Sequence, residues 1–227
     1  MLIKDNDTIL FQGDSITEWG RRFCINNACN FIEDDLNNTK NVGYGYVRSI
    51  AQQFFSVYPK TNVSFINKGI RGNRTDELIK RWQSDCIDLK PNILTLLIGY
   101  NDCWNACHHN IKNPEIRFRN NYIELMDITK KELPNTKIIL MDPYLLVKED
   151  IDETHRERKI INTFINVVRE IAYEYKTEYI PLDSIFAKAC IEKNSYSEIS
   201  KDGVHPYMYG SNIIADAWLK AVGVKAF

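Results

Sequence analysis

The sequence predicts an α/β protein, a three-layer α/β/α sandwich built on a flavodoxin-like, five-stranded parallel sheet. Short β-branched apolar runs alternate with segments of helical periodicity along the whole chain, as in parallel sheets with right-handed crossovers. No low-complexity linker and no internal repeat interrupts this alternation. We therefore expect residues 1–227 to form one domain.

Five runs have the apolar character of buried parallel strands. They are residues 8–13 (TILFQG), 63–67 (VSFIN), 93–99 (ILTLLIG), 137–143 (KIILMDP) and 178–183 (EYIPLD). Five strands with intervening helices favour an open sandwich over an eight-stranded barrel. In such sheets ligands bind beyond the carboxyl ends of the strands, so the segments after the strands are where a site is expected.

The segments between the strands have helical periodicity. Residues 46–59 are expected to place Val47, Ile50, Ala51, Phe54 and Phe55 on one buried face, and residues 74–91 to place Leu78, Ile79, Trp82, Cys86 and Leu89 on another. Further helices are predicted over residues 114–134, 157–175 and 209–222.

Composition excludes several classes of partner. The 227 residues are 44% hydrophobic and carry a formal net charge of -1, so no basic field attracts nucleic acid. No signal peptide or membrane span is evident, and we expect a cytoplasmic protein without a membrane partner. The six cysteines are then expected to be reduced thiols.

One short segment resembles a metal site. Residues 103–109 (CWNACHH) contain two thiols four positions apart and two imidazoles, Cys103, Cys107, His108 and His109. They lack a second ligand pair at zinc-finger spacing. We therefore expect no metal and no cofactor.

Four motifs follow the predicted strands and fall at the same edge of the sheet. They are GDSIT with Ser15, NKGIRGNRT with Gly72, GYNDCW with Asn101, and DGVHP with Asp202 and His205. Each has a structural explanation when taken alone: Ser15 starts a helix, Gly72 meets a backbone angle, and Asn101 forms a turn.

Taken together, the motifs contain the groups that acyl transfer needs. Ser15 is the candidate nucleophile, His205 the base and Asp202 the carboxylate that orients the imidazole. Because Asp202 and His205 are three residues apart around Gly203, the loop can bring the carboxylate back to its own histidine. The backbone N–H groups of Ser15 and Gly72 and the Asn101 amide supply three oxyanion donors.

With these blocks in this order, the chain resembles the SGNH hydrolases, the GDSL esterase/lipase family, essentially from Thr8 to the last helix. Within that family the chain is most similar to bacterial acetylxylan and carbohydrate esterases, in the segments ILFQGDSITEWGR, GYGYV and IGYNDCW. The resemblance implies the SGNH hydrolase fold and the same catalytic and oxyanion residues. The rival α/β-hydrolase motif G-x-S-x-G is absent, because no glycine follows Ser15 two residues on.

Some positions depart from the usual family pattern. Arg71 stands where a small residue commonly precedes the oxyanion glycine, Arg74 follows closely, and YMYG follows the HP dipeptide. Arg71 and Arg74 either place positive charge beside the site or point outward and pair with acidic neighbours. The departures leave the catalytic set intact and leave the acyl and alcohol specificity open. Candidate substrate-binding residues near the motifs are Asp14, Trp19, Tyr44, Tyr46, Arg71, Tyr100 and Trp104, since aromatic faces suit sugar rings and equally suit a core.

The preferred function is a serine esterase that hydrolyses small acyl esters, chiefly O-acetyl, of sugars or xylo-oligosaccharides. One alternative is a broad-specificity thioesterase or lysophospholipase-like esterase. Another, from a different class, is a catalytically silent carbohydrate-binding protein on the same fold. The polar loop 21–41 is long enough to be a functional or interface element. Together with the assembly of relatives into oligomers, which the resemblance implies, it indicates a homo-oligomer.

Overall fold

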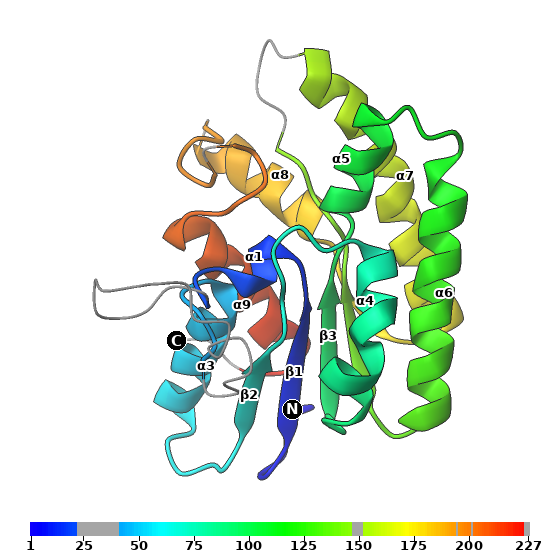
Figure 1. The fold of residues 1–227 in the computed structure, drawn as a ribbon. Coiled ribbons are helices and arrows are strands. Elements are labelled where there is room, and N and C mark those ends of the chain that lie inside the picture. Colours follow the sequence, from blue (N-terminus) through cyan, green and yellow to red (C-terminus); the bar gives the residue numbers. More distant parts are fainter. Residues whose placement is uncertain (22–40, 147–151, 194, 201, 225–227) are drawn as a thin grey trace, which may run out of the picture.

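The protein is built around five parallel strands in the order β2-β1-β3-β4-β5 (Figure 1). The computed structural model describes residues 1–21, 41–146, 152–193, 195–200 and 202–224. The strands are β1 (Thr8–Gly13), β2 (Ser64–Asn67), β3 (Ile93–Leu97), β4 (Lys137–Met141) and β5 (Glu178–Ile180). Each lies within a predicted run, although the last three end two or three residues earlier than expected.

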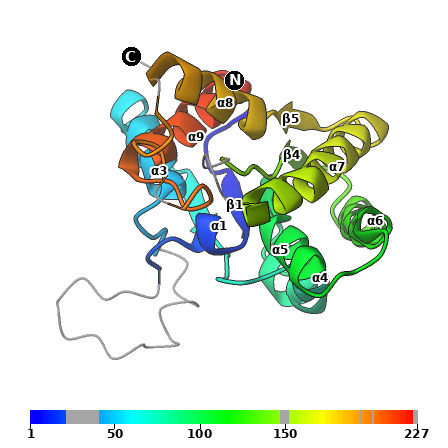
Figure 2. The ribbon, with the colours of Figure 1, turned by 90° about the horizontal axis from the view of Figure 1, so that it is seen from above.

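Helices cover both faces of the sheet, which confirms the predicted three-layer sandwich. Figure 2 shows α3, α8 and α9 on one side of the strands and α4, α5, α6 and α7 on the other. The helices are α1 (Ser15–Glu18), α3 (Tyr46–Val57), α4 (Thr75–Trp82), α5 (Tyr100–His108), α6 (Pro114–Glu132), α7 (Asp152–Glu174), α8 (Leu182–Lys193) and α9 (Met208–Ala221).

Two helices were not predicted, α5 and α8. The sequence analysis treated the start of α5 as a turn because it contains Asn101 and Asp102, yet these residue types are also common in the first turn of a helix. The helix α8 buries Leu182, Phe186 and Ala189. The long helix predicted over residues 74–91 also differs, because it changes to a π-helix, η1 (Gln83–Ile87), after α4.

The predicted buried face of α3 is wrong at one position. Phe54 is fully buried, but Phe55 keeps 36% of its surface exposed. Its ring meets the ring of Phe65 edge-on, with the centroids 5.6 Å apart. The helix therefore turns Phe55 toward the rim of the core, where an aromatic ring covers the edge of the sheet without entering it.

Close packing at the end of β1 positions the site. A Cβ added to Gly13 would lie 2.4 Å from the backbone oxygen of Leu97, the residue paired with Gly13 on β3. Only glycine permits this approach. The carboxyl ends of the two central strands therefore lie side by side, and the segments after them leave from the same point.

Part of one prediction concerns residues outside the described ranges. The polar loop 21–41 was expected to have a functional or interface role, and residues 22–40 are not described. Arg21, at its start, is buried and donates from Nη1 to the backbone oxygen of Gly69 at 2.8 Å. Across the described ranges, no helix has the length and apolar character needed to cross a bilayer.

A buried hydrogen bond joins the sheet to α9 and allows a test of the packing. Trp218 Nε1 donates to Thr95 Oγ1 at 2.9 Å, and both side chains are fully buried. Thr95→Val keeps the shape and leaves the indole N–H without an acceptor, which costs about 1–3 kcal/mol. We expect the Tm to fall by roughly 2–10 °C in thermal unfolding.

The double variant Thr95→Val with Trp218→Phe removes both polar groups and is the control. Its loss of stability should be smaller than the sum of the two single losses. Additive losses, or a Thr95→Val variant as stable as the original, would contradict this account of the α9–sheet contact.

Candidate active site

Ser15 is the first residue of α1, and one residue, Asp14, separates it from the end of β1. Asp14 caps this helix, since its Oδ1 accepts the backbone N–H of Ile16 at 2.9 Å. The helix-start interpretation of Ser15 is therefore confirmed. The same turn aims the Ser15 hydroxyl out of the sheet edge, so a structural and a chemical role coincide at this residue.

The Ser15 hydroxyl lies at one end of a chain of short hydrogen bonds. Its Oγ is 2.8 Å from Nε2 of His205, and His205 Nδ1 is 2.6 Å from Oδ2 of Asp202. The other carboxylate oxygen, Oδ1, accepts the backbone N–H groups of Val204 and His205 and the hydroxyl of Ser200. Hydroxyl, imidazole and carboxylate in this order form the arrangement used for nucleophilic acyl transfer.

These bonds also determine the charge of Asp202. Partial burial alone would raise the pKa of this carboxyl, but the hydrogen bonds from the His205 ring and from the His205 and Val204 amides outweigh it. They hold the pKa of Asp202 well below its usual range. The carboxylate therefore stays ionised at every working pH, and it is available to stabilise a proton on the imidazole.

Gly203 permits the Asp202–His205 loop to take this shape. Its φ is +85°, and an added Cβ would lie 2.4 Å from the backbone oxygen of Leu146. Gly203 O also accepts the N–H of Leu146 at 2.9 Å. The loop is thus held against the segment that follows β4, which brings the histidine over Ser15.

The predicted oxyanion donors lie on two further segments. Gly72 has a φ of +77°, and its backbone N–H has no hydrogen-bond acceptor among the described residues. Asn101 occupies the first turn of α5, where its Nδ2 donates to Asn73 O at 3.1 Å and to Asp14 Oδ2 at the longer distance of 3.3 Å. An oxyanion in the pocket would compete for the amide hydrogen in this longer contact.

Asp14 supports Asn101 from beneath and does not line the pocket. Only 1% of its surface is exposed, so its predicted role in binding substrate is wrong. Burial raises the pKa of Asp14 to about 6. The hydrogen bond from the Ile16 N–H and the charge–charge interaction with His205 oppose this shift. Its carboxylate contacts the cap of α1 and the amide of Asn101, and so connects two of the four motifs.

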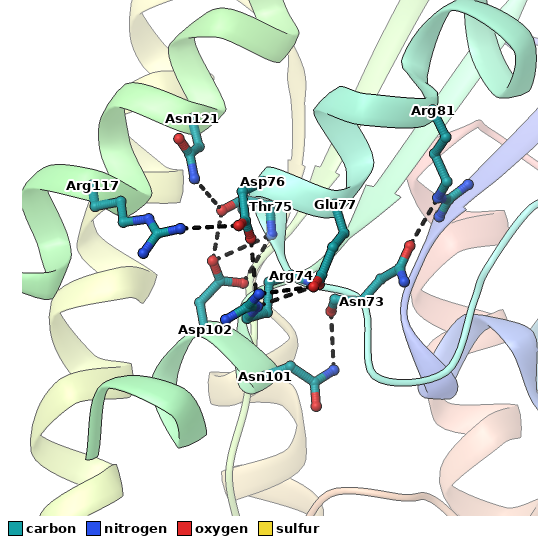
Figure 3. Close-up of polar contacts among 10 residues, drawn as sticks. All are labelled: Asn73, Arg74, Thr75, Asp76, Glu77, Arg81, Asn101, Asp102, Arg117 and Asn121. Carbon is teal, nitrogen blue, oxygen red and sulfur yellow. Dashed lines mark hydrogen bonds and ion pairs between the residues drawn. The ribbon is translucent and has the colours of Figure 1, made fainter. Parts of the chain in front are cut away.

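A second carboxylate beside the site, the half-buried Asp102, was not among the candidate site residues. Asp102 belongs to α5, and Figure 3 shows its side chain next to Thr75, the first residue of α4. Its oxygens accept the backbone N–H and the hydroxyl of Thr75, the hydroxyl at 2.6 Å. Asn121 of α6 donates to the same Thr75 hydroxyl at 2.9 Å. Asp102 therefore ties the Gly72 turn to the helix that carries Asn101.

A pocket of about 500 Å³ lies over these groups, a volume typical of small-ligand sites. It is lined by Ser15, Trp19, Arg71, Gly72, Asn101, Asp202, His205 and Tyr207. The Trp19 ring stacks beside the His205 ring, with the centroids 5.6 Å apart and the planes 24° apart. Tyr207 was missed as a lining residue, although the aromatic that directly follows the HP dipeptide was visible in the sequence.

Four aromatic candidates do not line this pocket. Tyr46 is fully buried and shares a hydrogen bond of 2.9 Å with Thr17, so its prediction as a substrate-binding residue is wrong. Tyr100 is partly buried with its hydroxyl directed at Glu157. The exposed side chains Tyr44 and Trp104 stack with Arg48 and His108, respectively.

The CWNACHH segment forms part of α5. The thiol of Cys103 is buried and donates to the backbone oxygen of Glu157 at 3.2 Å, and Cys107 is buried as well. Burial raises the pKa of Cys103 far above its usual value, which disfavours the thiolate form that binds metals. Among the described residues, no group of three or more His, Cys, Asp and Glu is arranged to hold a metal ion.

A larger hollow, of about 660 Å³, lies between α8 and the segment after β4. Its main polar feature is Arg158, which bonds both oxygens of Asp183, at 2.5 and 2.6 Å. This pair satisfies both charges internally. None of the five residues singled out in the four motifs lines this hollow, so the smaller pocket over Ser15 is the candidate active site.

The fold and this site define a class of protein. The chain matches the model of the GDSL-like lipase/acylhydrolase family over residues 11–212, and it belongs to that family. It is a carboxylic ester hydrolase. The resemblance drawn from the four motifs is therefore confirmed.

Individual relatives agree in fold and in length. The acetylxylan esterase of Geobacillus stearothermophilus is 29% identical over 232 residues, which cover 99% of this chain and 98% of the relative. A crystal structure from Parabacteroides merdae, described as a GDSL-like lipase, has a TM-score of 0.84 and 33% identity and covers 98% of each chain. Axe2, the acetylxylan esterase of Geobacillus stearothermophilus, has a TM-score of 0.81 and 27% identity, covering 99% of this chain and 98% of its own.

The half-buried carboxyl of Asp102 gives a pH-dependent prediction. Burial raises its pKa to about 7, against about 3.9 in an unfolded chain. Between these values the folded state binds more protons, so this group makes the free energy of unfolding fall as pH rises and adds no slope above about pH 7. Asp102→Asn removes the titration and keeps an oxygen that accepts from Thr75, so its Tm should fall less than that of the original protein between about pH 5 and pH 8.

Asp216→Asn is the control for the loss of one carboxyl, because Asp216 is exposed on α9 and bonds only Gln53 among the hydrogen bonds of the described side chains. Its Tm should follow that of the original protein across the same range. Parallel curves for the original protein and Asp102→Asn would show that Asp102 does not titrate in this window.

Proposed function

We propose that this esterase removes small acyl groups, chiefly O-acetyl, from sugars or xylo-oligosaccharides through Ser15, His205 and Asp202. The observation that carries the proposal is the continuous hydrogen-bonded chain from the Ser15 hydroxyl to the Asp202 carboxylate, at the base of a pocket. We also keep a cytoplasmic, homo-oligomeric enzyme as part of this proposal. Light scattering of the purified protein tests the oligomer.

The first half of the reaction forms an acyl-enzyme. His205 Nε2 takes the proton of Ser15 as Oγ attacks the ester carbonyl carbon. The oxyanion is held by the N–H groups of Ser15 and Gly72 and by the Asn101 amide. Asp202 stays ionised and stabilises the imidazolium. When the tetrahedral intermediate collapses, the carbon–oxygen bond to the alcohol breaks and His205 Nε2 donates its proton to the leaving oxygen.

The second half releases the acid. Water replaces the alcohol and gives a proton to His205 Nε2 as its oxygen attacks the acyl carbon. The same donors hold the second oxyanion. Its collapse breaks the bond to Ser15 Oγ, which takes the proton back from His205, so the enzyme returns to its starting state.

One observation supports a sugar ester as substrate, and another supports the three catalytic residues. Trp19 and Tyr207 give the pocket aromatic surface that can stack on a sugar ring. In Axe2, alanine replacements of a serine, an aspartate and a histidine are catalytic mutants, and that histidine lies three positions after the aspartate. Asp202 and His205 have the same spacing.

Ser15→Ala tests the nucleophile. Because the hydroxyl forms the bond to the acyl group, the variant should lose roughly 10⁵–10⁶ in kcat on 4-nitrophenyl acetate. A fluorophosphonate probe should label the original protein at Ser15 and leave the variant unlabelled, as read by mass spectrometry of the peptides. Asn101→Ala, which removes one oxyanion donor, should lose only about 10²–10³.

Ser195→Ala is the matched control, since this serine lines the larger hollow and bonds Ser197. It should keep both labelling and activity. Near-original activity in Ser15→Ala, or labelling at Ser195 instead, would overturn the assignment.

The choice of substrate needs its own comparison. We expect a higher kcat/KM for acetate release from acetylated xylo-oligosaccharides than for long-chain acyl esters or acyl-CoA, because none of the described residues that line the pocket has an aliphatic side chain to cover a long acyl chain. Faster cleavage of acyl-CoA would favour the thioesterase alternative. Sugar binding with no release of acetate would favour the silent binding protein.

A further inference from the structure

Arg71 occupies the turn that carries the candidate oxyanion glycine. The Asn73 N–H donates to Ile70 O at 3.1 Å and closes a turn over residues 70–73, with Gly72 at a φ of +77°. The turn is anchored just before Arg71, because a Cβ on Gly69 would lie 2.4 Å from the backbone of Glu18. The backbone of Arg71 is thus held beside the Gly72 N–H.

The side chain of Arg71 lies at the pocket wall and remains largely open to solvent. It is 57% exposed, and its Nε approaches Glu18 Oε2 only to 3.9 Å. At this distance the ion pair is too long for a hydrogen bond. The guanidinium therefore presents donors to the pocket that the Glu18 contact does not occupy.

Neighbouring arginines differ from Arg71 in this respect. Arg74 reaches Glu77 at 2.8 Å, Arg81 reaches Asp85 at 2.9 Å, and Arg117 reaches Asp76 at 2.9 Å. Figure 3 shows Arg74 directed toward Glu77 and Asp76. These three arginines bond a carboxylate directly and do not line the pocket.

The charge of Arg71 is not cancelled by the pocket itself. Among the residues that line it, the one carboxylate belongs to Asp202. Both oxygens of Asp202 accept hydrogen bonds from the loop of His205. A cation next to the reacting groups, with its donors facing open space, is suited to a planar anion such as a carboxylate.

We propose that Arg71 binds a carboxylate carried by the alcohol part of the ester. This inference rests on the proposed function, in which the acyl group is small and uncharged, so that the anion belongs to the leaving group. For an acetylated saccharide the group is the carboxylate of a uronic acid residue. Arg71 thereby selects acidic acetylated oligosaccharides over neutral ones.

Two aryl acetates, one with a charged and one with a neutral leaving group, test this selection. 4-Acetoxybenzoate carries a carboxylate on its leaving group, and its methyl ester does not. Arg71→Gln should lower the ratio of kcat/KM for the acid to that for the methyl ester by about 10-fold or more, the factor expected from one hydrogen-bonded charged contact. The change should lie mainly in KM, because the contact forms in both the ground and transition states.

Two further variants make the result specific. Arg71→Lys keeps the charge without the planar fork, so its ratio should lie between those of the original protein and Arg71→Gln. Arg117→Gln removes an arginine of similar exposure, 55% against 57%, outside the pocket. It should leave the ratio at the original value. High ionic strength should reduce the original protein's preference and leave that of Arg71→Gln unchanged.

The outcomes separate this inference from the proposed function. Hydrolysis of both esters with the same ratio in Arg71→Gln as in the original protein overturns the role of Arg71 and leaves the esterase intact. Failure of the original protein to hydrolyse either ester overturns the proposed function and this inference with it. An Arg71-dependent preference for 4-nitrophenyl hydrogen succinate, which carries its charge on the acyl side, overturns the placement on the alcohol.

Discussion

The parallel pairing of β1 with β3 is the constraint on which the site depends. It sets Gly13 against Leu97, so close that no side chain fits at the glycine. Ser15 leaves one strand and Asn101 leaves the other within a few residues of this contact. Ser15 and His205 are 190 positions apart in the chain, and their hydrogen bond forms because the end of β1 is central and accessible from several loops.

Two acids, the buried Asp14 and the half-buried Asp102, hold the segments of the site in position. Asp14 connects the Ser15 turn with Asn101, and Asp102 connects Asn101's helix with the turn of Gly72. Burying carboxylates costs free energy, which is evident in their raised pKa values. This free-energy cost falls on the segments that position the oxyanion donors. Perturbed pKa values of this kind are common at functional sites.

Much of the fold and of the site was predictable from the sequence. Apolar runs locate the strands because a parallel strand is buried on both faces. The four motifs follow these runs, so their meeting at one edge follows from topology. The start of α5 was not predictable from local patterns, because Asn101 and Asp102 suit a turn and a helix start equally well.

Side-chain placement around the site was harder to predict. Tyr46 and Trp19 have similar amphipathic character, yet one lies in the core and the other stacks on His205. This difference depends on the helix orientation set by long-range packing, which no local pattern encodes. Asp102 was missed for the same reason, since its partner Thr75 lies on another helix and Thr75 in turn is bonded by Asn121 of a third.

In the turn at residues 70–73, two adjacent residues border the pocket in different ways. At Gly72 the backbone supplies the amide, and the open space around its Cα leaves that amide unobstructed. Arg71 also lines the pocket, and the hydrogen bond that closes the turn joins the backbones of Asn73 and Ile70, so it does not require an arginine at position 71. A substitution at position 71 therefore changes a side chain at the pocket wall and leaves the Gly72 amide beside it in place, so that recognition of the substrate can alter while the oxyanion donor is kept.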